Sequence, residues 1–139
     1  MKTLALIHPL FQCLSFLVGA YNFWMGLSRK GFTYRRHRGI GTIYYAMSLL
    51  GLVGGWLLAR WLREGGVELH LGNHLEVAFL MVPLFLVAAS LGLILRRRPR
   101  LRSALLPLHR YLNLATLLFF LLQAYTGFSA LFRLHSYRY

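Results

Sequence analysis

Histidines are the residues of this chain whose type and spacing point most directly to chemistry. Imidazole titrates near neutral pH and is the commonest protein ligand of transition metals, so a histidine can move protons or hold a metal. The chain has six histidines, and four of them stand one each at or near the start of a long apolar segment: His8, His37, His74 and His109. The other two, His70 and His135, lie in polar stretches, where we expect them to face solvent.

Residue sets for other chemistries are missing from the sequence. There are only three acidic residues and a single cysteine, Cys13, so no disulfide framework or cysteine-rich metal site can be built. We find no carboxylate pair, no nucleophile–base set, no phosphate-binding loop and no HExxH motif. The histidines therefore carry the functional hypothesis alone.

The elements that position these histidines are predicted to be membrane-spanning helices. The 139 residues are 58% hydrophobic and 14% charged, which is too apolar for a soluble domain of this size. A bilayer of about 30 Å is crossed by about 20 helical residues, and four apolar stretches are long enough. These stretches cover residues 4–27, 40–62, 75–95 and 104–132. No linker divides the chain, so we expect one integral membrane domain over residues 1–139.

Short polar loops separate the four stretches. Helices joined by short loops are antiparallel neighbours, so the expected fold is an all-α, up-down-up-down four-helix bundle. Loops one and three, with their flanks, hold eleven of the 16 Lys and Arg residues, whereas all three acids lie on the opposite side. Basic loops stay in the cytoplasm. This rule predicts a cytoplasmic location for loops one and three, with both termini outside.

The net charge of +13 also raises nucleic-acid binding as a possible function. Such binding needs a basic polar face interleaved with aromatic or hydrogen-bonding side chains. Because the basic residues of this chain crowd into two loops between apolar segments, membrane topology explains the charge and we expect no nucleic-acid partner.

Alternating helix directions sort the four histidines into two levels. His8 and His74 are expected near the outer face, and His37 and His109 near the cytoplasmic face. Each pair joins helices that are not neighbours along the chain, so its imidazoles face each other across the bundle axis. Two imidazoles in that arrangement can bind the iron of a haem from both sides. The sequence therefore predicts two b-type haems, one near each membrane face.

A zinc site and a purely structural role are the two alternatives to haem. Zinc prefers three or four ligands at one point, but each level offers only two helix histidines and no nearby cysteine. Histidines can also serve as hydrogen-bonded core residues or lie at the membrane interface. One histidine per helix, matched in depth, favours haem over that interpretation. His70 replaces His74 as the outer ligand if His74 is not used.

A glycine follows each of these histidines by 18 residues. Eighteen residues are five helical turns, or about 27 Å, so the glycine shares the face of its histidine at the opposite membrane side. We expect these glycines to let a porphyrin approach the backbone, although helix packing through small residues is the alternative. The four glycines are Gly26, Gly55, Gly92 and Gly127.

Polar residues near the histidines complete the candidate site, because polar side chains within membrane spans usually face the bundle interior. Gln12 and Asn113 each follow a proposed ligand by four residues and can orient an imidazole or a neighbouring side chain. Basic side chains beside the inner ligands can neutralise haem propionates or simply set topology. These are Arg36, Arg38 and Arg110. Residues expected either to line the haem edges or to form interhelical hydrogen bonds are Tyr21, Asn22, Gln123, Tyr125 and Thr126.

One histidine per helix, paired first with third and second with fourth, resembles the four-helix core of the cytochrome b561 family. His8-Pro9, His37 with Gly41, and the segment from Gln123 to Gly127 look closer still to a bacterial four-span family of unassigned function. The eukaryotic members have two further helices that this chain lacks. The resemblance implies two bis-histidine haems and electron transfer across a bacterial inner membrane.

The expected function is that of a transmembrane electron carrier. Bis-histidine coordination leaves no open position on iron, which disfavours direct oxygen chemistry. The expected donors are a quinol, a small reductant or a redox protein such as a cytochrome, and the small size indicates a subunit of a larger oxidoreductase in contact with membrane lipid. The alternative is a structural membrane subunit with one haem or none.

Overall fold

The computed structural model describes residues 2–67, 69 and 71–136, and the side chains of residues 6–67, 69 and 71–133. Within these residues the fold is all-α, as the sequence predicts. The four long helices and one short 3-10 helix are α1 (Lys2–Ser28), α2 (Tyr34–Glu64), α3 (His74–Arg97), η1 (Pro99–Leu101) and α4 (Arg102–Ser136).

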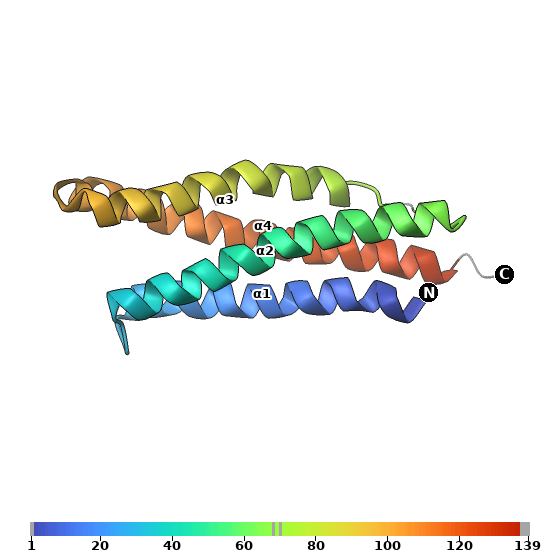
Figure 1. The fold of residues 1–139 in the computed structure, drawn as a ribbon, viewed down its shortest axis with the longest axis horizontal. Helices are drawn as coiled ribbons and strands as arrows, with labels where there is room; N and C mark the ends of the chain where they lie inside the picture. Colours follow the sequence, from blue (N-terminus) through green and yellow to red (C-terminus); the bar gives the residue numbers. More distant parts are fainter. Residues whose placement is uncertain (1, 68, 70, 137–139) are drawn as a thin grey trace.

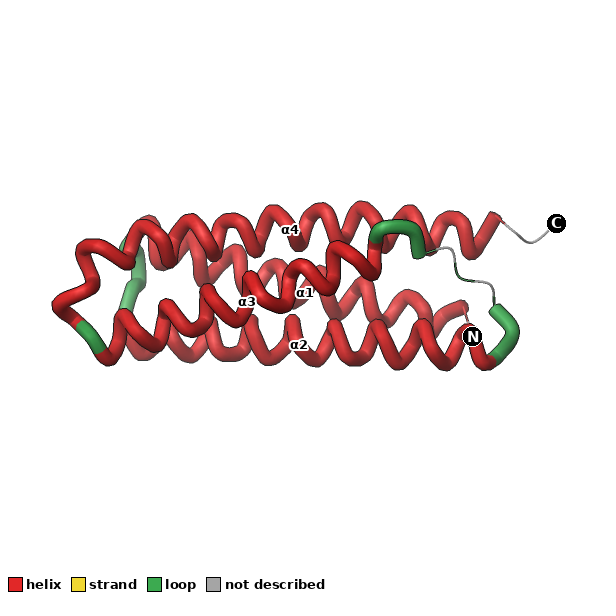
Figure 2. Tube along the Cα trace, turned by 90° about the horizontal axis from the view of Figure 1, so that it is seen from above, coloured by secondary structure: helices red, strands yellow, loops and turns green. Residues whose placement is uncertain are grey.

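All four long helices lie side by side along the long axis of the molecule (Figures 1 and 2). The turns joining α1 to α2 and α3 to α4 lie at one end, here called the arginine-rich end. The start of α1, the end of α2, the start of α3 and the end of α4 lie at the other, the opposite end. Contacts are dense within the α1–α2 and α3–α4 hairpins, fewer between α1 and α4, and sparse between α2 and α3. Among the described residues the backbones of α1 and α3, and those of α2 and α4, do not come close to each other, so these pairs are the diagonals of the bundle and meet only through side chains.

Helix α2 begins six residues before the expected span, at Tyr34. The hydroxyl of Thr33 accepts a hydrogen bond from the backbone N–H of Arg36 at 3.2 Å, which caps the helix. Arginine is a good helix former, so the basic stretch continues the helix instead of forming a loop. As a result His37 lies in the first turns of α2, with defined helical geometry.

The centre of the bundle is an aromatic layer made of Tyr44, Phe85 and Phe120 together with Met81. The rings of Tyr44, Phe85 and Phe120 lie with centroids 5.8–6.1 Å apart in tilted or edge-to-face arrangements, the separation that aromatic pairs favour. This layer draws on three helices and separates the histidines near one end from those near the other.

The outer surface of the helices is apolar. Leu10, Tyr125 and Phe132 are about two-thirds exposed or more, at 67%, 71% and 72%. All four long helices are long and apolar enough to cross a membrane. The protein is therefore a multi-pass membrane protein, and hydrocarbon covers these side chains in place of water.

Candidate functional site

His8 on α1 and His74 on α3 meet across one diagonal of the bundle, near the opposite end. Their ring centroids lie 6.5 Å apart, and the ring planes are nearly perpendicular at 88°. A metal–imidazole bond is about 2.1 Å, and a ring nitrogen lies about 1.1 Å from the ring centre, so two imidazoles on opposite sides of one metal have centroids about 6.4 Å apart. The observed separation matches that value.

Hydrogen bonds determine which nitrogen of His74 carries the proton. The hydroxyl of Thr126 donates to the backbone carbonyl of Gln123 at 3.1 Å, which uses its one hydrogen. The same oxygen lies 3.0 Å from Nδ1 of His74, so it must accept there and Nδ1 must be the donor. Neutral His74 therefore has its lone pair on Nε2, the nitrogen that can bind a metal.

That lone pair has a partner already. The side-chain Nε2 of Gln123 lies 3.2 Å from Nε2 of His74 and donates to it, while Oε1 of Gln123 is buried without a hydrogen bond. A metal bound to His74 would replace this bond, and the carboxamide would have to turn away. Gln123 is thus a competitor for the nitrogen, whereas Thr126 orients the ring.

His37 on α2 and His109 on α4 occupy the other diagonal, near the arginine-rich end. They lie within electrostatic reach of each other. The ring of His37 packs against Phe32, with centroids 5.4 Å apart, and its Nδ1 is buried without a hydrogen bond. An unpartnered buried ring nitrogen is costly, so this site is not fully satisfied by the protein alone.

Asn113 contacts His109 from one turn further along α4. Its Nδ2 donates to the backbone carbonyl of His109 at 2.7 Å and lies 3.3 Å from Nδ1 of the same residue. The hydroxyl of Tyr45 donates to Oδ1 of Asn113 at 3.0 Å, which fixes the amide in this orientation. Nδ1 of His109 is then an acceptor and its proton lies on Nε2, so binding a metal through Nε2 requires Asn113 to turn.

Each of the four glycines faces an imidazole. A methyl group added at Gly55 would lie 2.5 Å from the ring of His8, and one added at Gly127 would lie 2.9 Å from the ring of His74. At the arginine-rich end, the corresponding distance is 3.1 Å from Gly26 to His37. It is 3.5 Å from Gly92 to His109. In this structure the space left by each glycine is taken by a histidine ring.

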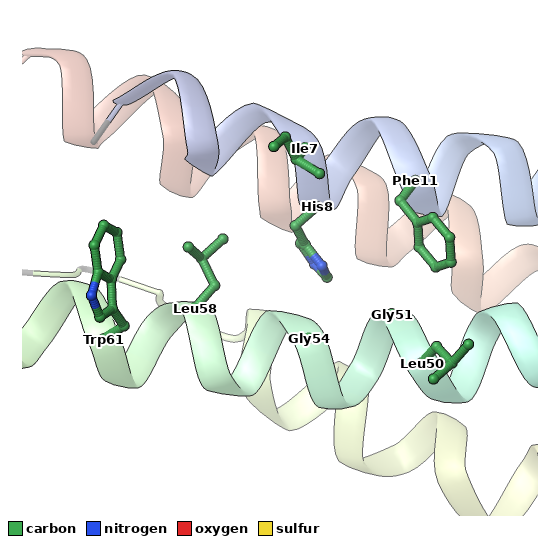
Figure 3. Close-up of a pocket in the computed structure, with 8 residues that line it drawn as sticks. All are labelled: Ile7, His8, Phe11, Leu50, Gly51, Gly54, Leu58 and Trp61. Atoms are coloured by element: carbon green, nitrogen blue, oxygen red, sulfur yellow. The ribbon is translucent and has the colours of Figure 1, made fainter.

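A groove of about 340 Å³ lies between α1 and α2 at the level of His8 (Figure 3). Its lining consists of Ile7, His8, Phe11, Leu50, Gly51, Gly54, Leu58 and Trp61. His8 projects from α1 towards α2 in this groove. The carboxamide of Gln12 packs against Gly51, and its Oε1 is buried without a hydrogen bond. The structure therefore places Gln12 on the backbone of α2, one turn from His8.

The three arginines near His37 and His109 in the sequence lie at the arginine-rich end. Arg36 donates from Nη2 to the hydroxyl of Tyr21 at 2.8 Å. Arg38 is exposed and Arg110 is half-buried. These positions allow either role that the sequence leaves open, propionate binding or topology. His70 lies outside the described residues, so the structure does not place it beside His74.

Four residues make contacts that the sequence does not single out. Tyr45 fixes Asn113, and its spacing from His37 carries no motif that would reveal this. Tyr44 lies against Gly19, where an added methyl group would meet its ring at 2.5 Å. Ser15 and Ser48 are buried and bond to each other at 3.0 Å. The contacts of Tyr44 with Gly19 and of Ser15 with Ser48 hold α1 and α2 together between the two histidine levels.

The residues at the opposite end fit a bis-histidine haem better than those at the arginine-rich end. The first pair has the required ring separation and His74 is already in the metal-binding tautomer, so only the Gln123 carboxamide must turn away from it. At His109 both the ring proton and Asn113 must move. In the described part of the chain, no three His, Cys, Asp or Glu side chains gather into a group that could hold a metal ion, which is what structural zinc requires. Comparison with protein-family profiles, with characterised proteins and with solved structures gives no match to this chain.

Proposed function

We propose that this protein is a membrane cytochrome of the b type that passes electrons across the bilayer. In this proposal His8 and His74 hold one haem, and His37 and His109 hold a second. The observation that carries it is the 6.5 Å separation of the His8 and His74 rings across a diagonal of four membrane-spanning helices.

When bound, haem iron would supply a reversible one-electron change. The protein groups would orient the ligands and keep water out. Thr126 would hold His74 with Nε2 free for iron, and such orienting partners are a regular part of metal sites. The aromatic layer would keep the two sites apart within an apolar interior. His8, His74, His37 and His109 would hold the two groups, which would supply electron exchange and not oxygen or substrate binding.

Topology belongs to the same proposal. The bundle is up-down-up-down, with the arginine-rich end in the cytoplasm and both termini outside, as the distribution of basic residues indicates. Electrons enter at one face from a quinol, a small reductant or a redox protein and leave at the other. The protein acts as a subunit of a larger redox complex in the inner membrane of a bacterium.

A second function is favoured by one specific observation. The rings of His74 and His109 are both bonded to carboxamides of α4, Gln123 and Asn113. Histidines in such networks can hold helices together without any cofactor. This would make the protein a structural subunit with one haem or none.

Electron transfer in vesicles tests the proposal. The purified protein is placed in liposomes that enclose ferricyanide, and dithionite is added outside. We expect ferricyanide to be reduced in protein-containing liposomes, with haem absorbance changing on the same sample. Liposomes with a variant that lacks His8 and His37 serve as the control. Intact liposomes in which wild type and control reduce ferricyanide equally would refute transmembrane electron transfer and favour the structural function.

A further inference from the structure

The four glycines and four histidines pair within hairpins. His8 on α1 faces Gly55 on α2, and His37 on α2 faces Gly26 on α1. The α3–α4 hairpin repeats the arrangement with His74 against Gly127 and His109 against Gly92. Each hairpin therefore supports both of its own imidazoles, because each ring lies against the backbone of the other helix of the same hairpin.

A backbone carbonyl lies beside the rings in three of the four pairs. His37 lies near the carbonyl of Asn22, four residues before the facing Gly26. His74 lies near the carbonyl of Gln123, four residues before Gly127. His109 lies near that of Ala88, four residues before Gly92. The offset is the same each time.

Helix geometry explains this offset. In an α-helix the carbonyl of residue i−4 accepts a hydrogen bond from the N–H of residue i and points towards it. A carbonyl oxygen has a second lone pair, which the Cβ of residue i would normally cover. Glycine has no Cβ, so an imidazole can lie against the backbone there and reach the carbonyl.

We propose that these glycines are positioning residues that seat the ligand imidazoles, and that their main role is not to admit the porphyrin itself. This inference rests on the proposed haem function. Each glycine would then affect the haem whose histidine it contacts. It would do so through the imidazole ring and not by direct contact with the porphyrin. The ring of His37, whose Nδ1 is buried without a hydrogen bond, lies against Gly26.

Adjacent glycines on α2 provide the test. Gly55→Ala places a methyl group 2.5 Å from the His8 ring, whereas a methyl group at Gly54 meets nothing within 4 Å. Both changes alter helix propensity equally. We expect Gly55→Ala to remove the outer haem from most molecules or to shift its midpoint potential and low-spin electron paramagnetic resonance signal. Gly54→Ala should leave content, potential and signal unchanged, because nothing lies within 4 Å of the added methyl group.

A second measurement separates imidazole seating from general packing. In a His8→Gly protein supplied with free imidazole, the ring is no longer tied to α1 and can shift away from an added methyl group. Gly55→Ala should then have no further effect on the outer haem. A purely structural role for Gly55, or a role in admitting the porphyrin, would keep the effect of Gly55→Ala in that background.

The outcomes are distinct. If the wild type contains haem but the Gly55→Ala and Gly54→Ala variants have the same haem content, potential and signal, the seating role is overturned and the proposed function stands. The same conclusion follows if Gly55→Ala has an undiminished effect in the His8→Gly protein supplied with imidazole. Wild type that binds no haem would overturn the proposed function and the seating role with it. A selective Gly55→Ala effect that disappears in the His8→Gly background supports the inference.

Discussion

Thr126 gives the sharpest prediction about the proposed haem site at His8 and His74, here called the outer site. Thr126→Val replaces the hydroxyl with a methyl group of nearly the same shape, so packing is retained while the partner of His74 Nδ1 is lost. Loss of a partner that orients a metal-bound histidine typically weakens metal affinity about 10–100-fold. This corresponds to about 1.4–2.7 kcal/mol. Leaving a buried N–H unpaired costs about 1–3 kcal/mol, which is the same range.

The assay is haem titration of the apo-protein in a background where His37 and His109 are both alanine, so that only the outer site remains. We expect Thr126→Val to bind haem about 10–100-fold more weakly than this background protein. Thr126→Ser keeps the hydroxyl and should bind normally. Equal affinities for the valine and serine variants would refute the tautomer argument, because the hydroxyl would then make no difference to His74.

Gln123 gives a prediction of opposite sign at the same ring. Its carboxamide donates to the lone pair of His74 Nε2 that iron would need. Gln123→Ala removes this competitor, so haem should bind as tightly or up to about fivefold more tightly, the equivalent of one hydrogen bond of about 1 kcal/mol. A loss of affinity as large as that of Thr126→Val would show that Gln123 supports the haem instead of competing with it.

Two further predictions concern topology and the core. Single cysteines at Thr33 and Arg100, in a cysteine-free background, should resist an impermeant thiol reagent in intact cells, while one at Gly66 should react. The reverse labelling pattern would show that the protein has the opposite orientation in the membrane. Phe120→Ala should lower the free energy of unfolding by about 3–5 kcal/mol in a denaturation titration, because the buried Phe120 ring is lost from the aromatic layer. It should also lower the content of both haems together, because that layer lies between the two proposed sites. Phe79→Ala, at a residue that is 61% exposed, should have little effect, and equal losses for the two variants would contradict this account.

Much of the fold could be predicted from the sequence, because membrane spans follow from long apolar runs. The start of α2 could not, since the arginines before residue 40 resemble a polar loop by charge alone. The Thr33 cap and the helix propensity of arginine extend the helix to Tyr34. Charge and propensity give conflicting signals there, and propensity determines the local structure.

The candidate site was predictable to the level of helix faces. Five-turn spacing places each histidine and glycine on one face, and the structure brings every such glycine against a histidine. The spacing alone does not specify that the group facing each glycine is an imidazole, because this depends on how far each helix is rotated within its hairpin. The contacts of Gln123 with His74 and of Tyr45 with Asn113 depend on the same rotations. Side-chain packing, not sequence periodicity, fixes them.

The most direct test of the central claim is the haem-to-protein ratio of the purified protein, measured together with its reduced-minus-oxidised spectrum. We expect a ratio near two for the wild type. For single alanine variants at His8, His37, His74 and His109 we expect a ratio near one, because each should keep the haem of the other pair. A wild type that contains one haem or none, or a His74→Ala protein that keeps both, would contradict the account.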